Sequence, residues 1–298
     1  MSASALHRYW HENGAGPSAR GKAPFALVTG STGGMGEEWA LQLAALGFNV
    51  IIQGRNKGKL ETVRSQIHKL APDADVRLLV TEATVYPNPA LTEGLAKLLD
   101  EPDVRLTVVI SNLGVNELSY PKLDEQSSES VAGIVLANAF YPAEVARICL
   151  PHLKRHEPSL LVTVTSIGCW APPPYLSPYC GTKGFDVSFS RSLHNEMICE
   201  KRQVDIVCMV PGQVSSNMCL EPVSRMVPTS ADWVKAGIAS LRSTWWTPRP
   251  GAVVVPWGPH AWGMFFIAWA PAFMVNAIAR SKVVTMRDEY LAANAKDK

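Results

Sequence analysis

The stretch "FALVTGSTGGMGEEWALQLAALG", residues 25–47, joins an apolar run of strand length to a helical pattern through a glycine-rich turn. Its first six residues predict a strand, and its last twelve predict a helix with a regular apolar face. Gly30, Gly34 and Gly36 lie in the turn with the spacing G-x-x-x-G-x-G. Glycine permits a tight turn and a close approach of the backbone, and the start of a helix offers free N–H groups to an anion. This strand–turn–helix arrangement predicts a site for the phosphates of a dinucleotide.

Apolar runs of strand length alternate with helical patterns along most of the chain. Further strands are expected at 48–54, 75–80, 105–111, 159–166, 204–210 and 252–256, and helices at 59–70, 127–154 and 179–201. Short buried strands separated by helices form βαβ units, whose right-handed crossovers build a parallel sheet. We therefore expect a three-layer α/β/α, doubly wound Rossmann fold in a single domain at 23–298. A flexible N-terminal arm is expected at 1–22.

Composition narrows the functional classes. The chain has 298 residues, of which 47% are hydrophobic and 18% charged, and its formal net charge is +2. It contains no basic cluster of the kind that binds nucleic acid. None of its six cysteines forms a C-x-x-C pair, so no metal site or redox dithiol is expected. The N-terminus lacks the apolar core of a signal peptide, which favours a cytoplasmic, reducing environment.

The loop after the second strand indicates which dinucleotide is bound. An acid at the end of this strand typically binds a ribose 2′-hydroxyl, whereas an arginine nearby accommodates a 2′-phosphate. The sequence "IIQGRNKGK" (51–59) has Gln53 and no acid; Arg55 follows, with Asn56 as a further donor. An arginine can bind a phosphate through two parallel hydrogen bonds. The loop therefore predicts NADPH rather than NADH, and the other interpretation is a solvated basic loop.

Six motifs in sequence order extend this interpretation across the chain. They are "TGSTGGMG" (29–36), "SNLG" (111–114), Asn138 within "VLANAF", Ser166 within "VTVTSIG", "YCGTK" (179–183) and "PGQVSS" (211–216). With these motifs the chain resembles the classical short-chain dehydrogenase/reductase family. Within that family it is most similar to the hydroxysteroid dehydrogenases and the very-long-chain ketoacyl-CoA reductases. The arginine after the second strand, the "SNLG" variant and the apolar C-terminal region carry this narrower resemblance.

The resemblance implies a catalytic set of Asn138, Ser166, Tyr179 and Lys183. Tyr179 and Lys183 are four residues apart and share one face of a helix. A nearby ammonium favours the phenolate, so we expect it to lower the pKa of Tyr179 and make this residue a usable acid or base near neutral pH. Ser166 would hold the substrate carbonyl. Asn138 would steady a water that relays protons to Lys183, and Lys183 would also hold the nicotinamide ribose.

The resemblance also implies contacts to the cofactor and to the substrate. In addition to Tyr179, Lys183, the three glycines, Arg55 and Asn56, the expected cofactor contacts are Ser31, Thr32, Met35, Glu82, Asn112, Gly114, Pro211, Gly212, Val214 and Ser216. The expected substrate contacts are Ser166, Tyr179, Trp170 and Tyr175. A helix that begins at Pro178 leaves Tyr175 outside the catalytic register, where it lines the substrate mouth or packs in its own loop.

The segment 252–280 is the most unusual part of the chain. Residues 252–279 include no Asp, Glu, Lys or Arg, and prolines at 256, 259 and 271 interrupt any single membrane-spanning helix. Four interpretations stay open: a lid over a lipophilic substrate, a subunit interface, a peripheral contact with an intracellular membrane, or ordinary core. The preceding segment, 213–247, is expected to form a substrate-loop region.

These features predict an NADPH-dependent ketoreductase that reduces a lipophilic substrate to an alcohol, with a tyrosine as proton donor. Steroid-like, ketoacyl and polyketide-type ketones all fit. Two alternatives stay open: the site could catalyse an epimerisation, dehydration or cyclisation of a secondary metabolite, or the chain could be a non-catalytic NADP-binding sensor or scaffold. The resemblance also implies a homodimer or homotetramer, formed through two long helices at about 127–150 and 178–200.

Overall fold

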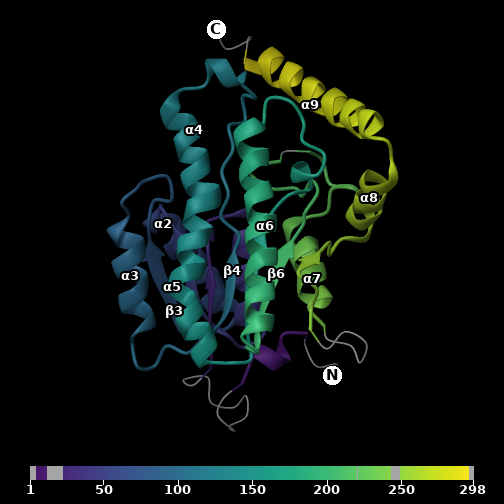
Figure 1. Ribbon diagram of the computed structural model, residues 1–298. Helices are drawn as coiled ribbons and strands as arrows, with labels where there is room; N and C mark the ends of the chain where they lie inside the picture. The colour runs from purple at the N-terminus through teal and green to yellow at the C-terminus, as the bar shows by residue number, and fades with distance from the viewer. Residues whose placement is uncertain (1–4, 12–22, 220, 243–248, 295–298) are drawn as a thin grey trace.

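The centre of the molecule is a parallel sheet of seven strands (Figure 1). The computed structural model describes residues 5–11, 23–219, 221–242 and 249–294. The strand order is β3-β2-β1-β4-β5-β6-β7. The strands are β1 (Phe25–Val28), β2 (Asn49–Gly54), β3 (Val76–Val80), β4 (Leu106–Ser111), β5 (Ser159–Val164), β6 (Val204–Met209) and β7 (Val253–Val254). Because the order reverses between β1 and β4, a crevice is expected where these two strands end.

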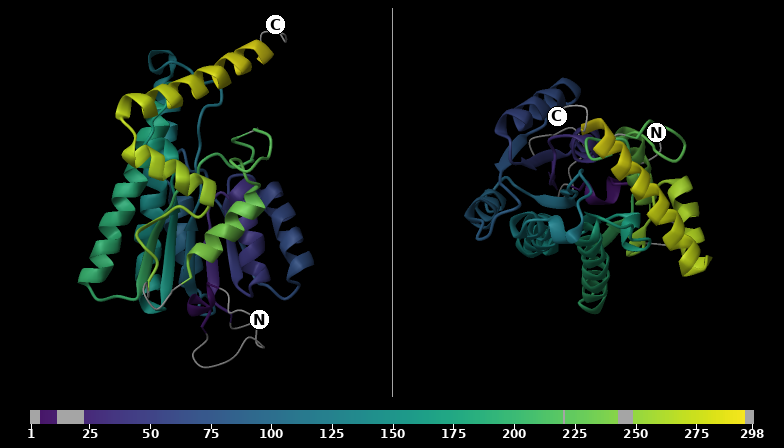
Figure 2. Two further views of the ribbon diagram at one scale, coloured as in Figure 1. Left: turned by 90° about the vertical axis from the view of Figure 1, so that its right-hand side faces the viewer. Right: turned by 90° about the horizontal axis from the view of Figure 1, so that it is seen from above.

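Helices cover both faces of this sheet, which confirms the predicted doubly wound fold (Figures 1 and 2). The helices are α1 (Gly34–Ala45), α2 (Lys57–Leu70), α3 (Pro89–Leu99), α4 (Ser128–Val135), α5 (Tyr141–Arg155), α6 (Ser177–Cys199), α7 (Ser230–Ser240), α8 (Gly258–Trp269) and α9 (Ala272–Asn294). The core on one face joins α1, α2 and α7 to the sheet, and the core on the other joins α3, α5 and α6. Strands covered on both faces must be apolar throughout, which explains their continuous hydrophobic sequences.

The long helix expected at 127–154 contains a π-helical turn that the sequence did not predict. This turn, η4 (Leu136–Phe140), separates α4 from α5 without breaking the helical run. Such turns are rare and occur frequently at functional sites. Among the described residues, Ser128–Arg155 is also the one helical run apolar enough to cross a membrane by length and composition, and half of its most apolar window is buried.

The expectation of a flexible N-terminal arm is wrong for residues 5–11. His7–Tyr9 forms a 3-10 turn, and Leu6 and Tyr9 are buried beneath the amino ends of the strands. The Tyr9 hydroxyl donates a 2.7 Å hydrogen bond to Asp205 Oδ2 at the start of β6. Arg8 adds an ion pair to the same oxygen at 3.3 Å. Tertiary contacts with the sheet therefore order a segment whose own sequence carries no strong structural signal.

Removing the Tyr9 hydroxyl should destabilise the protein. In Tyr9→Phe the buried Asp205 loses a donor, and we expect the free energy of unfolding to fall by about 1–3 kcal/mol. Chemical denaturation measures this change. Tyr86→Phe is the matched control, because Tyr86 is exposed and the change there should lie within about 0.5 kcal/mol of zero. Equal stability of the two variants would contradict a docked N-terminal turn.

The predicted substrate-loop region, 213–247, is only partly a loop. Its second part forms α7, which packs against α1. Trp233 and Val234 of α7 are fully buried in the core beside Trp39 of α1. Residues 243–248 lie outside the described part of the chain. Among the described residues of this region, most of the irregular part therefore precedes Ser230.

The C-terminal segment forms two helices that lie across the upper end of the molecule (Figures 1 and 2). α8 and α9 are separated at Pro271, which cannot continue a helix. Most large apolar side chains of this segment face solvent: Trp262 is 74% exposed, Trp269 76% and Phe273 73%. The interpretation of 252–280 as ordinary core is therefore wrong for these side chains.

Candidate active site

The glycine turn lies at the carboxyl end of β1, as the sequence predicts. Gly30 and Gly34 have φ angles of +69° and +58°, which side chains rarely adopt. Gly36 has no room for a side chain, because a Cβ there would overlap the carbonyl oxygen of Gly30 and lie 2.7 Å from Asn112 Nδ2. The first turn of α1 is consequently drawn against the end of the sheet. This arrangement leaves its N-terminal amide groups aimed at the crevice where a pyrophosphate would lie.

Gln53 braces this turn, a role that sequence reasoning missed. Its side chain is fully buried and accepts a 3.0 Å hydrogen bond from the Gly30 N–H. The same amide donates to the hydroxyl of Thr81 at the end of β3, at 2.9 Å. Ser31, expected to contact the cofactor, is also fully buried and donates its hydroxyl to Val28 O at 2.7 Å. The Ser31 side chain therefore stabilises the turn and is not available to a ligand.

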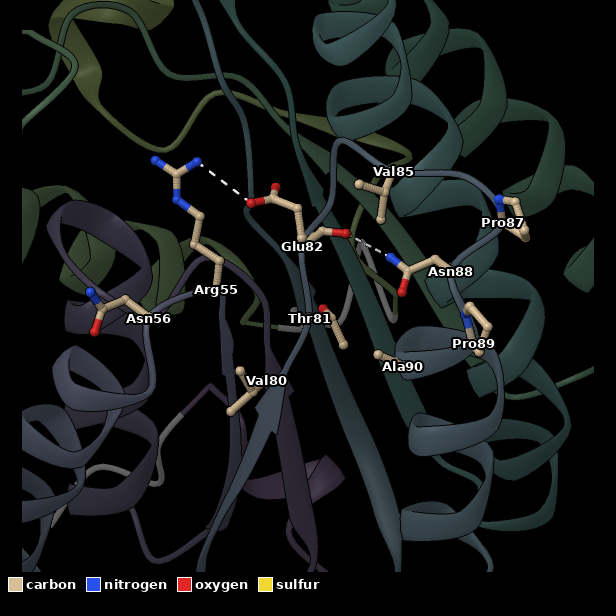
Figure 3. A pocket seen from close by; sticks show the side chains of 10 residues that line it. All are labelled: Arg55, Asn56, Val80, Thr81, Glu82, Val85, Pro87, Asn88, Pro89 and Ala90. Atoms are coloured by element: carbon tan, nitrogen blue, oxygen red, sulfur yellow. Dashed lines mark hydrogen bonds and ion pairs between the residues drawn. The ribbon is translucent and has the colours of Figure 1, made fainter.

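A pocket of about 640 Å³ lies between the ends of β2 and β3 (Figure 3). Arg55 and Asn56 line one side, and Glu82 lies opposite. Arg55 is largely exposed and lies 3.6 Å from Glu82, whereas Asn56 caps α2 by accepting from the Lys59 N–H at 3.0 Å. Burial opposes the charge of Glu82, but hydrogen bonds from Thr84 and the charge of Arg55 lower the pKa of this carboxyl. The pocket thus presents an exposed cation beside a carboxylate held by Thr84.

The "SNLG" motif joins the glycine turn to the catalytic residues. The backbone N–H of Asn112 donates to Thr29 Oγ1 at 3.0 Å, so the ends of β1 and β4 are held together. Asn112 Oδ1 is buried and has no hydrogen-bond partner among the described residues. A Cβ on Gly114 would lie 3.6 Å from Lys183 Nζ and 3.8 Å from Asn138 Oδ1. The chain at Gly114 therefore passes directly in front of two predicted catalytic side chains.

Asn138 lies in the π-helical turn and holds the loop after β4. It is fully buried, accepts from the Val115 N–H at 2.7 Å and donates to Val115 O at 2.8 Å. Both polar atoms of its side chain are therefore engaged by backbone groups. Its side chain acts on the loop directly, and the predicted water relay would have to use other atoms of this turn.

Tyr179, Ser166 and Lys183 come together between β5 and the first turns of α6. α6 begins at Ser177, so the spacing of Tyr179 and Lys183 places both toward the sheet, while Tyr175 precedes the helix as predicted. Ser166 follows β5, its hydroxyl accepts from the Gly168 N–H at 3.1 Å, and it lies near enough to Tyr179 to lower the pKa of that phenol. The expectation of a lowered pKa for Tyr179 is wrong here: burial raises this pKa, and the charge of Lys183 and the nearby Ser166 only partly offset burial. Tyr179 is therefore a protonated donor at neutral pH.

Asp186 is a charged partner of Lys183 that sequence reasoning missed. The two side chains are almost fully buried, and Lys183 Nζ donates to Asp186 Oδ2 at 2.9 Å and to Val164 O at 3.0 Å. Burial lowers the pKa of Lys183, but the adjacent carboxylate outweighs burial and the pKa is raised. Lys183 therefore stays charged, with its third proton available to a ligand. The i,i+3 spacing of this pair was the available sequence signal.

The loop after β6 folds back over the glycine turn. Ser216 lies beside Gly34, and a Cβ on Gly33 would lie 2.8 Å from Asn217 Nδ2. Gly212 is fixed by His260 of α8, whose Nδ1 accepts from the Gly212 N–H at 3.1 Å and whose other nitrogen contacts Met226 O at 2.9 Å. Pro211 and Val214 belong to the loop after β6, Thr32 to the glycine turn, and Met35 to the first turn of α1. The loop residues predicted to border the nicotinamide are therefore held in place by His260, which the sequence analysis did not single out.

The predicted substrate residues lie on the loop between β5 and α6. Trp170 ends the 3-10 turn after Ser166, and Tyr175 has a φ of +65°. The guanidinium of Arg287, from α9, stacks 4.8 Å from the Tyr175 ring centre. A second hollow of about 710 Å³ lies nearby, but its α6 residues, including Cys180 and Gly184, belong to the opposite side of the helix from Tyr179. This hollow is therefore separate from the catalytic side chains.

Comparisons with known proteins agree with this geometry. Residues 24–225 match the family model described as short chain dehydrogenase. A very-long-chain 3-oxoacyl-CoA reductase of Eremothecium gossypii is 30% identical over 252 residues, which cover 83% of this chain and 70% of that protein. A protein of the same name from Pyricularia oryzae is 27% identical over 241 residues, covering 80% and 71%. The predicted resemblance to the very-long-chain ketoacyl-CoA reductases is confirmed.

Solved structures share the fold at lower identity. A short-chain dehydrogenase from Sphingobium yanoikuyae in complex with NADPH has a TM-score of 0.68 at 20% identity, covering 82% of this chain and 93% of its own. A 7beta-hydroxysteroid dehydrogenase has a TM-score of 0.74 at 14% identity, covering 93% and 99%. With the family model matching about two thirds of the sequence, the chain belongs to the short-chain dehydrogenase family and is an oxidoreductase.

Proposed function

We propose that the protein is an NADPH-dependent reductase of a lipophilic ketone, with a 3-oxoacyl thioester as the first candidate substrate. One observation carries this proposal: the protonated Tyr179 lies next to Ser166 and beside the charged Lys183, and both neighbours lower the pKa of its phenol against the effect of burial. This combination binds a carbonyl oxygen and delivers a proton to it. The names of the curated relatives support the substrate class.

Each polar side chain has a separate task in this reaction. The hydroxyls of Ser166 and Tyr179 hold the carbonyl oxygen, and Tyr179 gives its proton to that oxygen as the alcohol forms. Lys183, kept charged by Asp186, stabilises the phenolate that is left. Asn138 fixes the loop at Val115 that faces these groups. NADPH, when bound, supplies the hydride to the carbonyl carbon.

The residues present fit a bound dinucleotide phosphate. The glycine turn excludes side chains from the phosphate position, and Asn112 Oδ1 is buried with no partner among the described residues. Arg55 and Asn56 would hold the 2′-phosphate, with Glu82 beside the adenine. Because the Arg55–Glu82 pair is exposed, its rearrangement would cost little. Gly114 and Lys183 would face the nicotinamide ribose.

Arg55→Ala should change the cofactor preference. The loss of charge-assisted hydrogen bonds to a phosphate predicts a Kd for NADPH about 10- to 100-fold higher, with the Kd for NADH changed less than about twofold. Fluorescence titration measures both constants. Arg64→Ala is the control, since Arg64 pairs with Glu61 on α2 away from the pocket. An equal increase in Kd for NADPH and NADH would show that Arg55 does not bind the 2′-phosphate.

α9 supports a lipophilic substrate by covering the mouth of the site. It contacts the three loops that follow β4, β5 and β6: Arg287 donates to Tyr120 O at 3.0 Å and stacks on Tyr175, and Lys282 donates to Gln213. We infer that the inner face of this helix acts as a lid. A cover that spans all three loops would shield an apolar chain next to Tyr179.

A product assay tests the reaction directly. NADPH oxidation would be followed with 3-oxoacyl-CoA thioesters of increasing chain length and with a steroid ketone. With a deuterium-labelled hydride donor, we expect one deuterium on the carbon of each alcohol formed, and kcat/KM rising with chain length. Turnover without consumption of NADPH would contradict reduction and favour an epimerisation, dehydration or cyclisation. Tight NADPH binding without any turnover would favour a sensor.

The predicted homo-oligomer remains a proposal. The helical layer of α4, α5 and α6 exposes several large apolar side chains: Val135, Phe140, Phe185 and Ile198. Phe185 also stacks on Phe189, with ring centres 5.6 Å apart. Such a surface suits a buried contact between two copies. A cytoplasmic location likewise stays a prediction.

A further inference from the structure

We propose that α8 and the first turns of α9 form a docking surface for a lipid bilayer with anionic headgroups. The surface is the outer apolar face of these helices: Trp262, Phe265, Phe266, Trp269, Phe273, Met274 and Ile278. A soluble helix normally turns its apolar stripe toward the core. Here the stripe faces solvent, and apolar patches of this kind mark interaction sites.

The spacing along α8 shows that its exposed aromatic side chains form one continuous stripe. Trp262, Phe265, Phe266 and Trp269 follow the pattern i, i+3, i+4, i+7, which is one stripe of a helix. The rings of Trp262 and Phe265 are 6.0 Å apart, and those of Phe265 and Trp269 6.1 Å. The opposite side of α8 is fixed to the protein through the buried His260. The stripe is therefore held outward by the fold.

The loop that contacts the start of α8, on the side of His260, also exposes apolar side chains. Met226 is 56% exposed and Val223 60% exposed. This loop is tied to the start of α8, because Trp257 Nε1 donates to Arg225 O at 2.9 Å and His260 contacts Met226 O. Tryptophan and phenylalanine are typical of helices that lie at a membrane–water interface, with basic residues at the border.

Charge favours a bilayer with anionic lipids over a neutral partner. Residues 258–287, which include α8 and most of α9, contain no Asp or Glu, whereas they include Arg280, Lys282 and Arg287. Arg280 is exposed and lies two residues beyond Ile278, whereas Lys282 and Arg287 turn toward the protein and donate to Gln213 and Tyr120. Each basic residue near an anionic membrane surface contributes favourably to binding. Arg280 would bind a headgroup while the aromatic side chains enter the interface.

The role of this docking rests on the proposed function, because a membrane would be the source of the lipophilic ketone that the enzyme reduces. The inner face of α9 covers the loops around Tyr179, while the outer face would rest on the membrane. A lipophilic ketone could then pass from the bilayer to the site beneath α9 without crossing water. Vesicle binding itself requires neither NADPH nor turnover, so it is tested independently of the reductase proposal.

The test is sedimentation of the full-length protein with vesicles. Vesicles of phosphatidylcholine containing about one third phosphatidylserine are compared with pure phosphatidylcholine. We expect binding to the anionic vesicles, weakened by high salt because salt screens exposed charges. Trp262→Ser/Trp269→Ser should lower the partition coefficient at least about tenfold, since two aromatic side chains no longer enter the interface. Arg280→Gln should lower binding to anionic vesicles only.

Matched controls make each outcome decisive. Leu46→Ser/Leu70→Ser removes two exposed apolar side chains at the carboxyl ends of α1 and α2, away from α8 and α9, and should bind vesicles as the wild type does. NADPH titration shows whether each variant is folded. No sedimentation of the wild-type protein with either vesicle would overturn the proposal. Absent vesicle binding, together with a solution mass that falls in the tryptophan variant, would instead assign the surface to a second copy of the chain.

Discussion

Tyr179→Phe is expected to lower kcat for ketone reduction about a thousandfold, within the range of about 10²- to 10⁴-fold for the loss of a general acid. The ring still fills its place against Ser166, but no proton reaches the carbonyl oxygen. The Kd for NADPH should change less than about twofold, because the hydroxyl is only one of many predicted contacts. Stopped-flow measurement of NADPH oxidation under single-turnover conditions separates the chemical step from binding.

Tyr175→Phe is the informative comparison, since both tyrosines precede Lys183 closely. Tyr175 lies outside α6 with its ring beneath Arg287, so loss of its hydroxyl leaves the stacked ring in place. We expect kcat to stay within about threefold of the wild type, because the variant loses no proton donor. A larger loss in Tyr175→Phe than in Tyr179→Phe would contradict the assignment of the proton donor.

The pH dependence follows from the raised pKa of Tyr179. Reduction needs the phenol, which is lost only as pH rises through a pKa above the ordinary tyrosine value. The rate of reduction should therefore be independent of this group between pH 6 and pH 8. Oxidation of the alcohol needs the phenolate, so its rate should increase with pH over the same interval. Steady-state rates in both directions, measured at matched ionic strength, check the sign.

Gly36→Ala is the second change with a large expected effect. The added Cβ would overlap the Gly30 carbonyl oxygen and crowd Asn112 Nδ2, and backbone groups cannot rotate away as a side chain could. We expect the free energy of unfolding to fall by about 3 kcal/mol, which lowers Tm by about 6 °C or more in a chain of this size. Displacement of the first turn of α1 should also weaken NADPH binding at least about tenfold.

The control for this change is Gly94→Ala in the middle of α3. A Cβ at Gly94 would meet only Leu79 Cδ1, at 3.9 Å, which is ordinary contact. Because alanine favours a helix over glycine, stability should rise by about 0.5–1 kcal/mol. Calorimetry and NADPH titration on both variants give the comparison. An unchanged Tm and an unchanged Kd in Gly36→Ala would contradict the close approach of α1 to β1.

Local spacing was sufficient for the fold class and for much of the candidate site. The strand–turn–helix unit at 25–47 identified β1, its glycine turn and α1, because these residues are adjacent in sequence. The interval from Tyr179 to Lys183 likewise placed both side chains on one face of α6. Periodicity identified β7 from its apolar run, and the doubly wound order follows from right-handed crossovers.

The hydrogen bonds that fix the backbone of the site could not be predicted from local spacing, because their partners are distant in sequence. Gln53 binds the Gly30 N–H, and His260 binds the Gly212 N–H across 48 positions. Sequence reasoning assigned the sign of the Tyr179 pKa shift from Lys183 alone, whereas burial determines it. The depth of a side chain depends on the whole assembled core, and no local pattern reports it.

At the two ends of the chain, too, local sequence predicted some features and tertiary contacts decided others. Composition identified 252–280 as strongly apolar, yet periodicity could not tell an inward stripe from an outward one. Contacts of His260, Lys282 and Arg287 with distant loops orient these helices and leave Trp262 and Trp269 in solvent. At the other end, Tyr9 is ordered by Asp205, 196 positions away. Short-range sequence thus determined which elements form, and long-range packing and burial decided which of their faces are covered and how their ionisable groups behave.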